Sequence, residues 1–244
     1  MAIYIYKTVP NLVKAMADFV VTVAQNMIAL NGEFNIALSG GNSPKKLYEM
    51  LASADYRQRI AWSKVNFFFG DERYVPADDS ENNSNMVRSV LFDPLDIAES
   101  SIFSVDTSLS PAEAARNYSS RIADHFRGKE TVFDLILLGL GDNSHTASLF
   151  PNTAVLQAQS VSVQAVFLEQ QNVYRITMTA PMINLARQIA FLVYGQSKAE
   201  AVHHVLEDGY DPEKYPAQLI KPEGGDLRWY LDEEAASLLK DKEH

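Results

Sequence analysis

The segment DLILLGLGDNSHTASLFP, residues 134–151, joins a strand pattern to a polar turn that contains a histidine. Its residues 135–138 are all apolar, which predicts a strand that is covered on both faces of a sheet. Two glycines and His145 follow, at the carboxyl end of that strand. Ligands bind at this end of the strands in open α/β sheets, so the segment predicts both a fold class and the place of a site.

Apolar strands and helical patterns alternate along the rest of the chain. Apolar residues recur at steps of three and four from Leu12 to Leu30, which predicts a helix over residues 11–30 that ends at Asn31-Gly32. Further strands are expected over residues 1–6, 34–38, 65–69, 175–179 and 189–193, and helices over 44–51, 82–91, 111–126 and 197–206, with a helix or turn over 231–239. This alternation predicts an α/β fold with a mainly parallel open sheet and helices on both faces. No linker or repeat divides residues 1–244, so we expect a single domain.

The composition excludes several classes of protein. Without cysteine the chain has no disulfide, thiolate nucleophile or cysteine-ligated metal. Its net charge of −10 and the lack of a basic run argue against a nucleic-acid partner. No apolar run approaches the ~20 residues that cross a bilayer, so no membrane partner is expected. The N-terminus lacks the pattern of a signal peptide, and we expect a cytoplasmic protein.

A second junction between strand and helix has the sequence SGGNSP, residues 39–44. Gly40 and Gly41 let the backbone approach a ligand closely, and a helix that opens at Pro44 presents free N–H groups to an anion. Asn42 and Ser43 add polar side chains. The pattern is typical of a phosphate site, and a tight turn with a helix cap has the same pattern.

Charged residues follow another predicted strand, in the sequence GDERYVP of residues 70–76. Asp71 and Arg73 would stand at the ligand edge of the sheet, or Arg73 would pair with a local carboxylate in a solvated loop. Arg175 lies in an otherwise apolar strand, and Lys198 lies where a strand gives way to a helix. These two cations are either surface charges or, with the loop of residues 39–43, parts of a phosphate site.

His145 is the histidine for which a chemical role is expected. It is placed near the start of a short predicted helix, and imidazole exchanges protons near neutral pH. His203 and His204 are adjacent, so they do not form the i, i+4 pair of a helical zinc site. We therefore expect no metal site.

Together these segments resemble the 6-phosphogluconolactonase family, within the superfamily of glucosamine-6-phosphate isomerases and 6-phosphogluconolactonases. Residues 39–44 resemble the family's glycine loop, and residues 71–76 resemble its DERxVP motif. Ser84-Asn85 resembles the family's Ser-Asn pair, and residues 145–151 resemble its HTASLFP motif. The RIT strand at residues 175–177 and the G-x-x-K-A turn at 195–199 extend the resemblance over nearly the whole chain. It implies a modified Rossmann-like fold, as in glucosamine-6-phosphate deaminases.

The resemblance also implies hydrolysis of 6-phospho-D-glucono-1,5-lactone to 6-phosphogluconate, in the pentose phosphate pathway, without a cofactor. His145 would take a proton from the attacking water, and Arg73 with the N–H groups of the Gly40-Gly41 loop would stabilise the oxyanion. Phosphate would be bound by Gly40, Gly41, Asn42, Ser43, Arg175 and Lys198. Asp71 would bind a sugar hydroxyl or hold Arg73. The protein is expected to be a monomer or a small homo-oligomer.

Two residues depart from the family pattern before the histidine, where Asn143-Ser144 replaces Asp-Gly. Ser144 then occupies a turn that could need a positive φ, and the loss of the aspartate leaves Asp142 as another carboxylate that could orient the imidazole. Three alternatives remain open: a glucosamine-6-phosphate deaminase or isomerase, a sugar-phosphate sensor without catalysis, and a nucleotide-binding protein. Against the deaminase, Phe150 stands where those enzymes have a glutamate.

Overall fold

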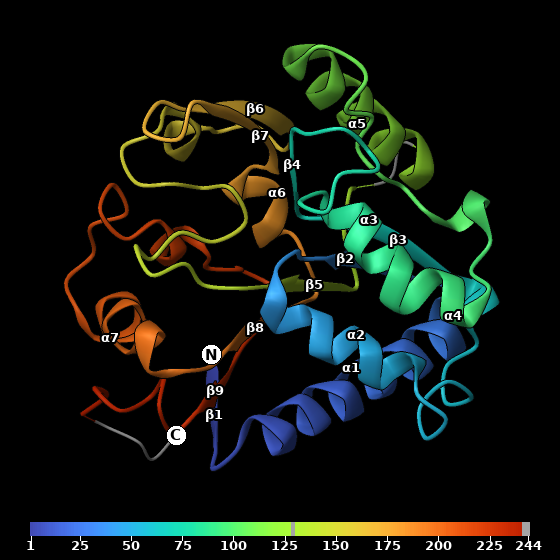
Figure 1. Ribbon diagram of the computed structural model, residues 1–244, viewed down its shortest axis with the longest axis horizontal. Helices are drawn as coiled ribbons and strands as arrows, with labels where there is room; N and C mark the ends of the chain where they lie inside the picture. Colours follow the sequence, from blue (N-terminus) through green and yellow to red (C-terminus); the bar gives the residue numbers. More distant parts are fainter. Residues whose placement is uncertain (128–129, 241–244) are drawn as a thin grey trace.

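The computed structural model describes residues 1–127 and 130–240, whose strands form two sheets (Figure 1). The strands are β1 (Ala2–Tyr6), β2 (Phe34–Leu38), β3 (Val65–Phe69), β4 (Asp71–Arg73), β5 (Leu135–Leu138), β6 (Val163–Leu168), β7 (Val173–Met178), β8 (Gln188–Val193) and β9 (Asp226–Asp232). The helices are α1 (Val9–Asn31), α2 (Asn42–Ala52), α3 (Asn83–Val87), α4 (Asp93–Leu95), α5 (Pro111–Phe126), α6 (Ala180–Asn184) and α7 (Ala199–Glu207).

The larger sheet is parallel and has the strand order β1-β9-β8-β5-β2-β3, whereas β4-β7-β6 form a small antiparallel sheet. From β2 the chain runs outward to β3, and it returns to the other side of β2 to form β5. The connections after β2 and β5 therefore lead apart, which places a crevice between the carboxyl ends of these two strands. The predicted α/β class with a mainly parallel sheet is confirmed.

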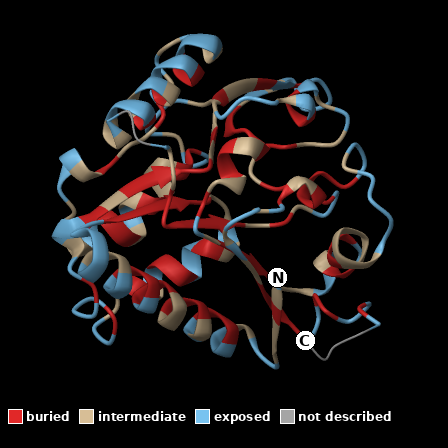
Figure 2. Cartoon of the chain, turned by 180° about the vertical axis from the view of Figure 1, so that it is seen from behind, coloured by how far each residue is buried: buried red, intermediate tan, exposed pale blue. Residues whose placement is uncertain are grey.

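Side chains of the parallel strands alternate between two cores, one on each face of the sheet. Ile36 and Leu38 of β2 pack with residues of α1 and α2, whereas Ala37 between them packs with residues of α5, α6 and α7. Buried residues are concentrated in the strands and on the helix faces turned towards them (Figure 2). Because both faces of the sheet are covered, its strands consist of nearly continuous apolar runs.

Helix α1 begins after Thr8, whose hydroxyl accepts a hydrogen bond from the Asn11 N–H, and it ends at Gly32 with a left-handed φ of 84°. By length and composition alone its 23 residues could cross a membrane, so the expectation that no segment meets this criterion was wrong. In the structure one face of α1, which includes the fully buried Leu12 and Met16, packs in the core beside the parallel sheet. A core helix of a globular protein has the same amphipathic pattern.

Three strands were not predicted: β4, β6 and β9. β4 and β6, of three and six residues, are the edges of the small sheet, and neither has a regular alternation of polar and apolar residues. The helix or turn predicted from residue 231 was wrong at its start, because Leu231 and Asp232 complete β9 and turns follow only from residue 233. The Asp232 carboxylate accepts hydrogen bonds from the backbone N–H groups of Gly195 and Ala235, which holds the chain as it leaves the strand.

Candidate active site

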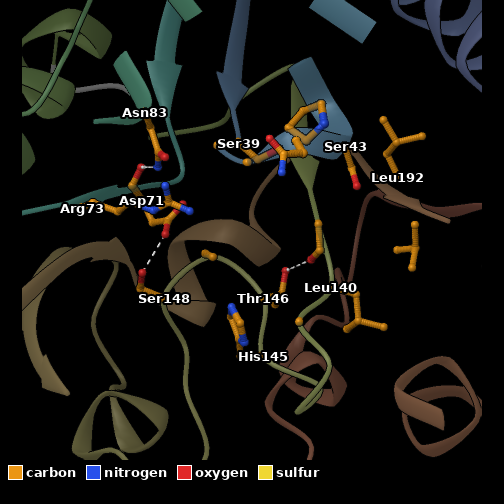
Figure 3. A pocket seen from close by; sticks show the side chains of 18 of the residues that line it. Ser39, Ser43, Asp71, Arg73, Asn83, Leu140, His145, Thr146, Ser148 and Leu192 are labelled. Carbon is orange, nitrogen blue, oxygen red and sulfur yellow. Dashed lines mark hydrogen bonds between the residues drawn. The ribbon is translucent and has the colours of Figure 1, made fainter. Parts of the chain in front are cut away.

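A cavity of about 390 Å³ lies at the carboxyl ends of the parallel strands, where β4 and β7 of the small sheet face them (Figure 3). A volume of this size suits a small molecule. All nine residues that the sequence marked as site candidates line this cavity: Gly40, Gly41, Asn42, Ser43, Asp71, Arg73, His145, Arg175 and Lys198. The fold thus brings together segments that are far apart in the chain.

One wall of the cavity is the loop between β2 and α2. Gly41 has a φ of 96°, which favours glycine, and α2 begins at Asn42, two residues before the Pro44 at which it was predicted to open. A Cβ atom on Gly40 would lie 1.8 Å from Oδ1 of Asn83, so glycine is needed for the two segments to meet. The first N–H groups of α2 have no partner within the helix and can bind an anion at this wall.

The opposite wall is built by β4 and β7. The strands pair so that Asp71 lies opposite Thr177 and Arg73 opposite Arg175. Side chains alternate along a strand, so Asp71 and Arg73 share the face that lines the cavity, and Glu72 points to the other face. The motif DER therefore contributes its first and third residues to the site.

Hydrogen bonds hold both of these side chains. The Ser148 hydroxyl donates to Oδ2 of Asp71 at 2.6 Å. Burial raises the pKa of Asp71, while this hydrogen bond and the charges of Arg175 and Arg73 act against the rise. Arg73 lines the cavity and also pairs with Glu81, with 3.1 Å between Nη1 and Oε2. The local carboxylate pairing that the sequence left open is therefore present.

Glu72 is fully buried and organises this wall from behind. Its carboxylate accepts hydrogen bonds from the backbone N–H groups of Arg73, Asn83 and Ser84, which joins β4 to the start of α3. Burial raises the pKa of Glu72 to about 7, against the effect of these hydrogen bonds. The side chain of Asn83 then donates to the backbone oxygen of Asp71 at 3.0 Å.

Asn83 and Ser148 line the cavity, although the sequence did not single them out. The Ser84-Asn85 pair, which resembles a family motif, is not among the residues that line the cavity. Asn85 donates to the backbone oxygens of Asp78 and Asp79 and so ties down the loop before α3. No local pattern marks Asn83, because its position depends on the buried carboxylate that binds its backbone.

His145 lies in an irregular loop after β5, and the short helix predicted there is absent from this loop. The loop needs a positive φ of 62° at Ser144, as the sequence suggested for a position where glycine is usual. Phe150 stacks on the imidazole with 4.0 Å between the ring centroids. Asn143 binds the ring through its Oδ1, which lies 2.5 Å from Nδ1.

The charges around His145 favour its neutral form. Burial of the ring lowers the pKa of His145 to about 4; the charges of Lys198 and Arg175 act in the same direction, and Asp142 acts against them. The imidazole is therefore unprotonated at neutral pH and can accept a proton. Asp142 does not orient the ring as the sequence left possible, because its Oδ1 lies 2.5 Å from Nζ of Lys198.

Three cations line the cavity: Arg73, Arg175 and Lys198. The Nε atom of Arg175 is buried and finds no hydrogen-bond partner among the described residues. Together with the start of α2, these groups suit an anionic ligand that is held near a neutral imidazole. Within residues 1–127 and 130–240, no three histidine, aspartate or glutamate side chains gather in a way that could hold a metal ion.

Known proteins of similar sequence cover most of this chain. The family model described as glucosamine-6-phosphate isomerases/6-phosphogluconolactonase matches residues 7–229. A 6-phosphogluconolactonase from Synechocystis sp. is 42% identical over 225 residues, which cover 91% of this chain and 91% of that protein.

Solved structures extend the comparison to the fold. A 6-phosphogluconolactonase from Trypanosoma cruzi is 29% identical and has a TM-score of 0.83, over 98% of this chain and 97% of that one. A monomeric glucosamine-6-phosphate deaminase also has a TM-score of 0.83, over 98% and 100% of the two chains, at 24% identity. The latter likeness shows a shared fold alone.

Proposed function

Because this chain belongs to the family of glucosamine-6-phosphate isomerases and 6-phosphogluconolactonases, we propose that it hydrolyses 6-phospho-D-glucono-1,5-lactone to 6-phosphogluconate, a step of the pentose phosphate pathway. One observation carries the assignment of the site: a neutral imidazole and three cations line the same cavity. We place the reaction in the cytoplasm, with other soluble sugar-phosphate metabolism.

The phosphate of the lactone is bound by the start of α2 and by side chains across the cavity. Ser43 and the backbone N–H groups around Gly41 and Asn42 donate hydrogen bonds to it. Arg175 supplies a planar pair of donors and Lys198 a point charge. Binding of the remote phosphate fixes the lactone carbonyl beside His145, so orientation supplies part of the acceleration.

His145 acts as general base and then as general acid. It takes a proton from a water molecule as the water oxygen bonds to C1 of the lactone, and the carbonyl oxygen becomes an oxyanion. Arg73 and the N–H groups of Gly40 and Gly41 stabilise that oxyanion. The bond between C1 and the ring oxygen then breaks, and the imidazolium returns the proton to the departing oxygen. Asp71 binds a sugar hydroxyl.

Phe150 distinguishes this reaction from deamination of glucosamine 6-phosphate on the same fold. Its ring stacks on His145, so the position offers no carboxylate that could move a proton. We therefore expect no release of ammonia from glucosamine 6-phosphate, which a coupled assay measures directly.

The experiment that tests the proposed base is a lactonase assay on the native protein and on His145→Ala, with lactone made freshly from glucose 6-phosphate. We expect kcat to fall by about 10²- to 10⁴-fold, after correction for spontaneous hydrolysis, with a modest change in KM. Lys198→Ala should mainly raise KM, since it removes a phosphate contact. Near-native turnover of the His145 variant would contradict the mechanism.

A further inference from the structure

Asn143 makes two contacts with His145 through the same atom. Its Oδ1 lies 3.3 Å from the backbone nitrogen of His145 and 2.5 Å from ring atom Nδ1. The side chain itself is exposed, so the residue contributes little to the core. Its position is set by the loop that follows β5, in which the Gly141 N–H donates to the backbone oxygen of His145.

These two contacts determine which ring nitrogen carries the proton. A backbone N–H is always a donor, so the Asn143 atom that faces it is the amide oxygen and not the amide nitrogen. The same oxygen faces Nδ1, and an oxygen without a proton accepts hydrogen bonds only. Nδ1 must therefore carry the proton in the neutral ring, and Nε2 keeps the lone pair.

The surroundings leave Nε2 as the nitrogen that faces substrate. Phe150 covers one face of the ring, and a Cβ atom on Gly141 would lie 2.0 Å from Nδ1, so the Nδ1 edge of the ring is closely packed. Asn143 lines a neighbouring groove, which residues 150–155 and 164–171 also line, whereas His145 lines the catalytic cavity. Nδ1 is thus bonded to a residue that does not line the substrate cavity, and Nε2 has no hydrogen-bond partner among the described residues.

Charged groups reach the ring from several elements. Lys198 follows β8 and Arg175 belongs to β7, and both disfavour the imidazolium, whereas Asp142 of the same loop favours it. Asp142 is itself paired with Lys198, and Asp71 and Arg73 line the same cavity from β4. Asn143 is the acceptor that binds the ring directly, and it adds no charge.

We propose, on the basis of the lactonase function argued above, that Asn143 is a positioning residue that holds His145 in the Nδ1–H tautomer through a neutral acceptor, and thereby keeps the base unprotonated in acidic solution. An aspartate at this place would hold the same tautomer but would stabilise the imidazolium as well. The neutral Asn143 amide therefore orients the ring without stabilising the positive charge of the imidazolium.

Nitrogen-15 NMR of the ligand-free protein tests the tautomer without any need for activity. The His145 signals are identified by their absence from His145→Ala. We expect protonated Nδ1 and unprotonated Nε2 in the native protein, the same tautomer in Asn143→Asp, and a mixture of tautomers in Asn143→Ala. A native protein with the proton on Nε2 would overturn the proposal.

The pH dependence of kcat/KM tests the role of the neutral amide. In Asn143→Asp the fall of kcat/KM on the acidic side, the acid limb, should occur about one pH unit higher, because a nearby carboxylate favours the imidazolium. In Asn143→Ala kcat should fall by about 10- to 100-fold, the scale of a misplaced catalytic group, and Asp should restore it. An acid limb at the same pH in Asn143→Asp would overturn the proposal.

Asn152→Asp is the matched control, because Asn152 is an exposed amide that lines the same groove as Asn143. The same charge at this position should leave the acid limb and the tautomer unchanged; a shift equal to that of Asn143→Asp would mean that the direct contact has no special effect. Absence of lactonase activity in a protein with the expected tautomer would contradict the proposed function but not the tautomer assignment.

Discussion

Gly141 has no side chain because the imidazole of His145 occupies the space in which one would begin. A Cβ atom there would lie 2.0 Å from Nδ1 and 2.1 Å from Cε1 of the ring. The ring is the end of a side chain, so it can move aside, whereas the backbone of Gly141 is held by its hydrogen bond to the backbone oxygen of His145. At this position the glycine is required by the place of the imidazole more than by backbone conformation.

We therefore expect Gly141→Ala to displace the imidazole while the fold is retained. A displacement of the order of 1 Å in a catalytic group costs up to about 10²-fold in rate, so kcat should fall by about 10- to 100-fold. Steady-state kinetics and the thermal midpoint of unfolding are the two measurements. Gly209→Ala is the control, since nothing lies within 4 Å of a Cβ atom there and the residue does not line the cavity, and equal losses of kcat in both variants would contradict the explanation.

Two buried tyrosines anchor strand ends from which the site loops start. The Tyr48 hydroxyl, from α2, accepts from the Ser39 N–H at 3.1 Å and donates to the Ser39 oxygen at 2.8 Å. The Tyr118 hydroxyl, from α5, makes the same pair of bonds to Phe69, at 2.7 Å and 3.1 Å. Each helix thus supplies hydrogen-bond partners for the backbone N–H and oxygen at the end of a parallel strand, and so positions the loop that follows.

Tyr48→Phe removes both hydrogen bonds to Ser39 and leaves buried backbone groups without partners. We expect a loss of about 1–3 kcal/mol in the free energy of unfolding, measured by urea denaturation. Because the glycine loop begins at Ser39, KM for the lactone should rise several-fold with little change in kcat.

Tyr56→Phe is the corresponding control at a distance from the cavity. The Tyr56 hydroxyl donates to Asp18 on α1, and neither residue lines the cavity. Its removal should leave KM unchanged. An unchanged KM in Tyr48→Phe as well would show that the tyrosine stabilises the fold without positioning the loop.

The cavity lies between the two sheets of the molecule, so a bound ligand contacts both. The loops after β2 and β5 belong to the parallel sheet, and Asp71, Arg73 and Arg175 belong to the small antiparallel sheet. The chain as a whole has a net charge of −10, yet three cations line this cavity. A local concentration of positive charge therefore attracts an anion that the molecule as a whole repels.

Binding of the product should stabilise the whole molecule. At 100 times its Kd, 6-phosphogluconate should raise the free energy of unfolding by about 2.7 kcal/mol, because it binds the folded chain alone. Thermal denaturation with increasing product measures the effect, and Lys198→Ala should need a higher concentration for the same rise. Gluconate, which has no phosphate, should stabilise much less; equal stabilisation by both would contradict the proposed phosphate contacts.

The sequence by itself determined the fold class, most of the central strands and nine of the residues that line the cavity. Apolar runs such as residues 135–138 report burial on both faces, and the turns rich in glycine and polar residues stand directly after them. These are local properties, so they can be seen without the fold. The strands β4 and β6 could not be predicted, because their backbones are held by pairing with β7 and not by a local pattern.

Only the tertiary structure decided how these residues are held. Buried Glu72 binds the start of α3 and so places Asn83 in the cavity, and Ser148 reaches Asp71 from a distant part of the chain. Asn143 contacts the imidazole, whereas Asp142 forms an ion pair with Lys198. Each of these depends on a hydrogen bond whose direction and partner are set when separate elements pack together, and a linear pattern carries no information about such directions.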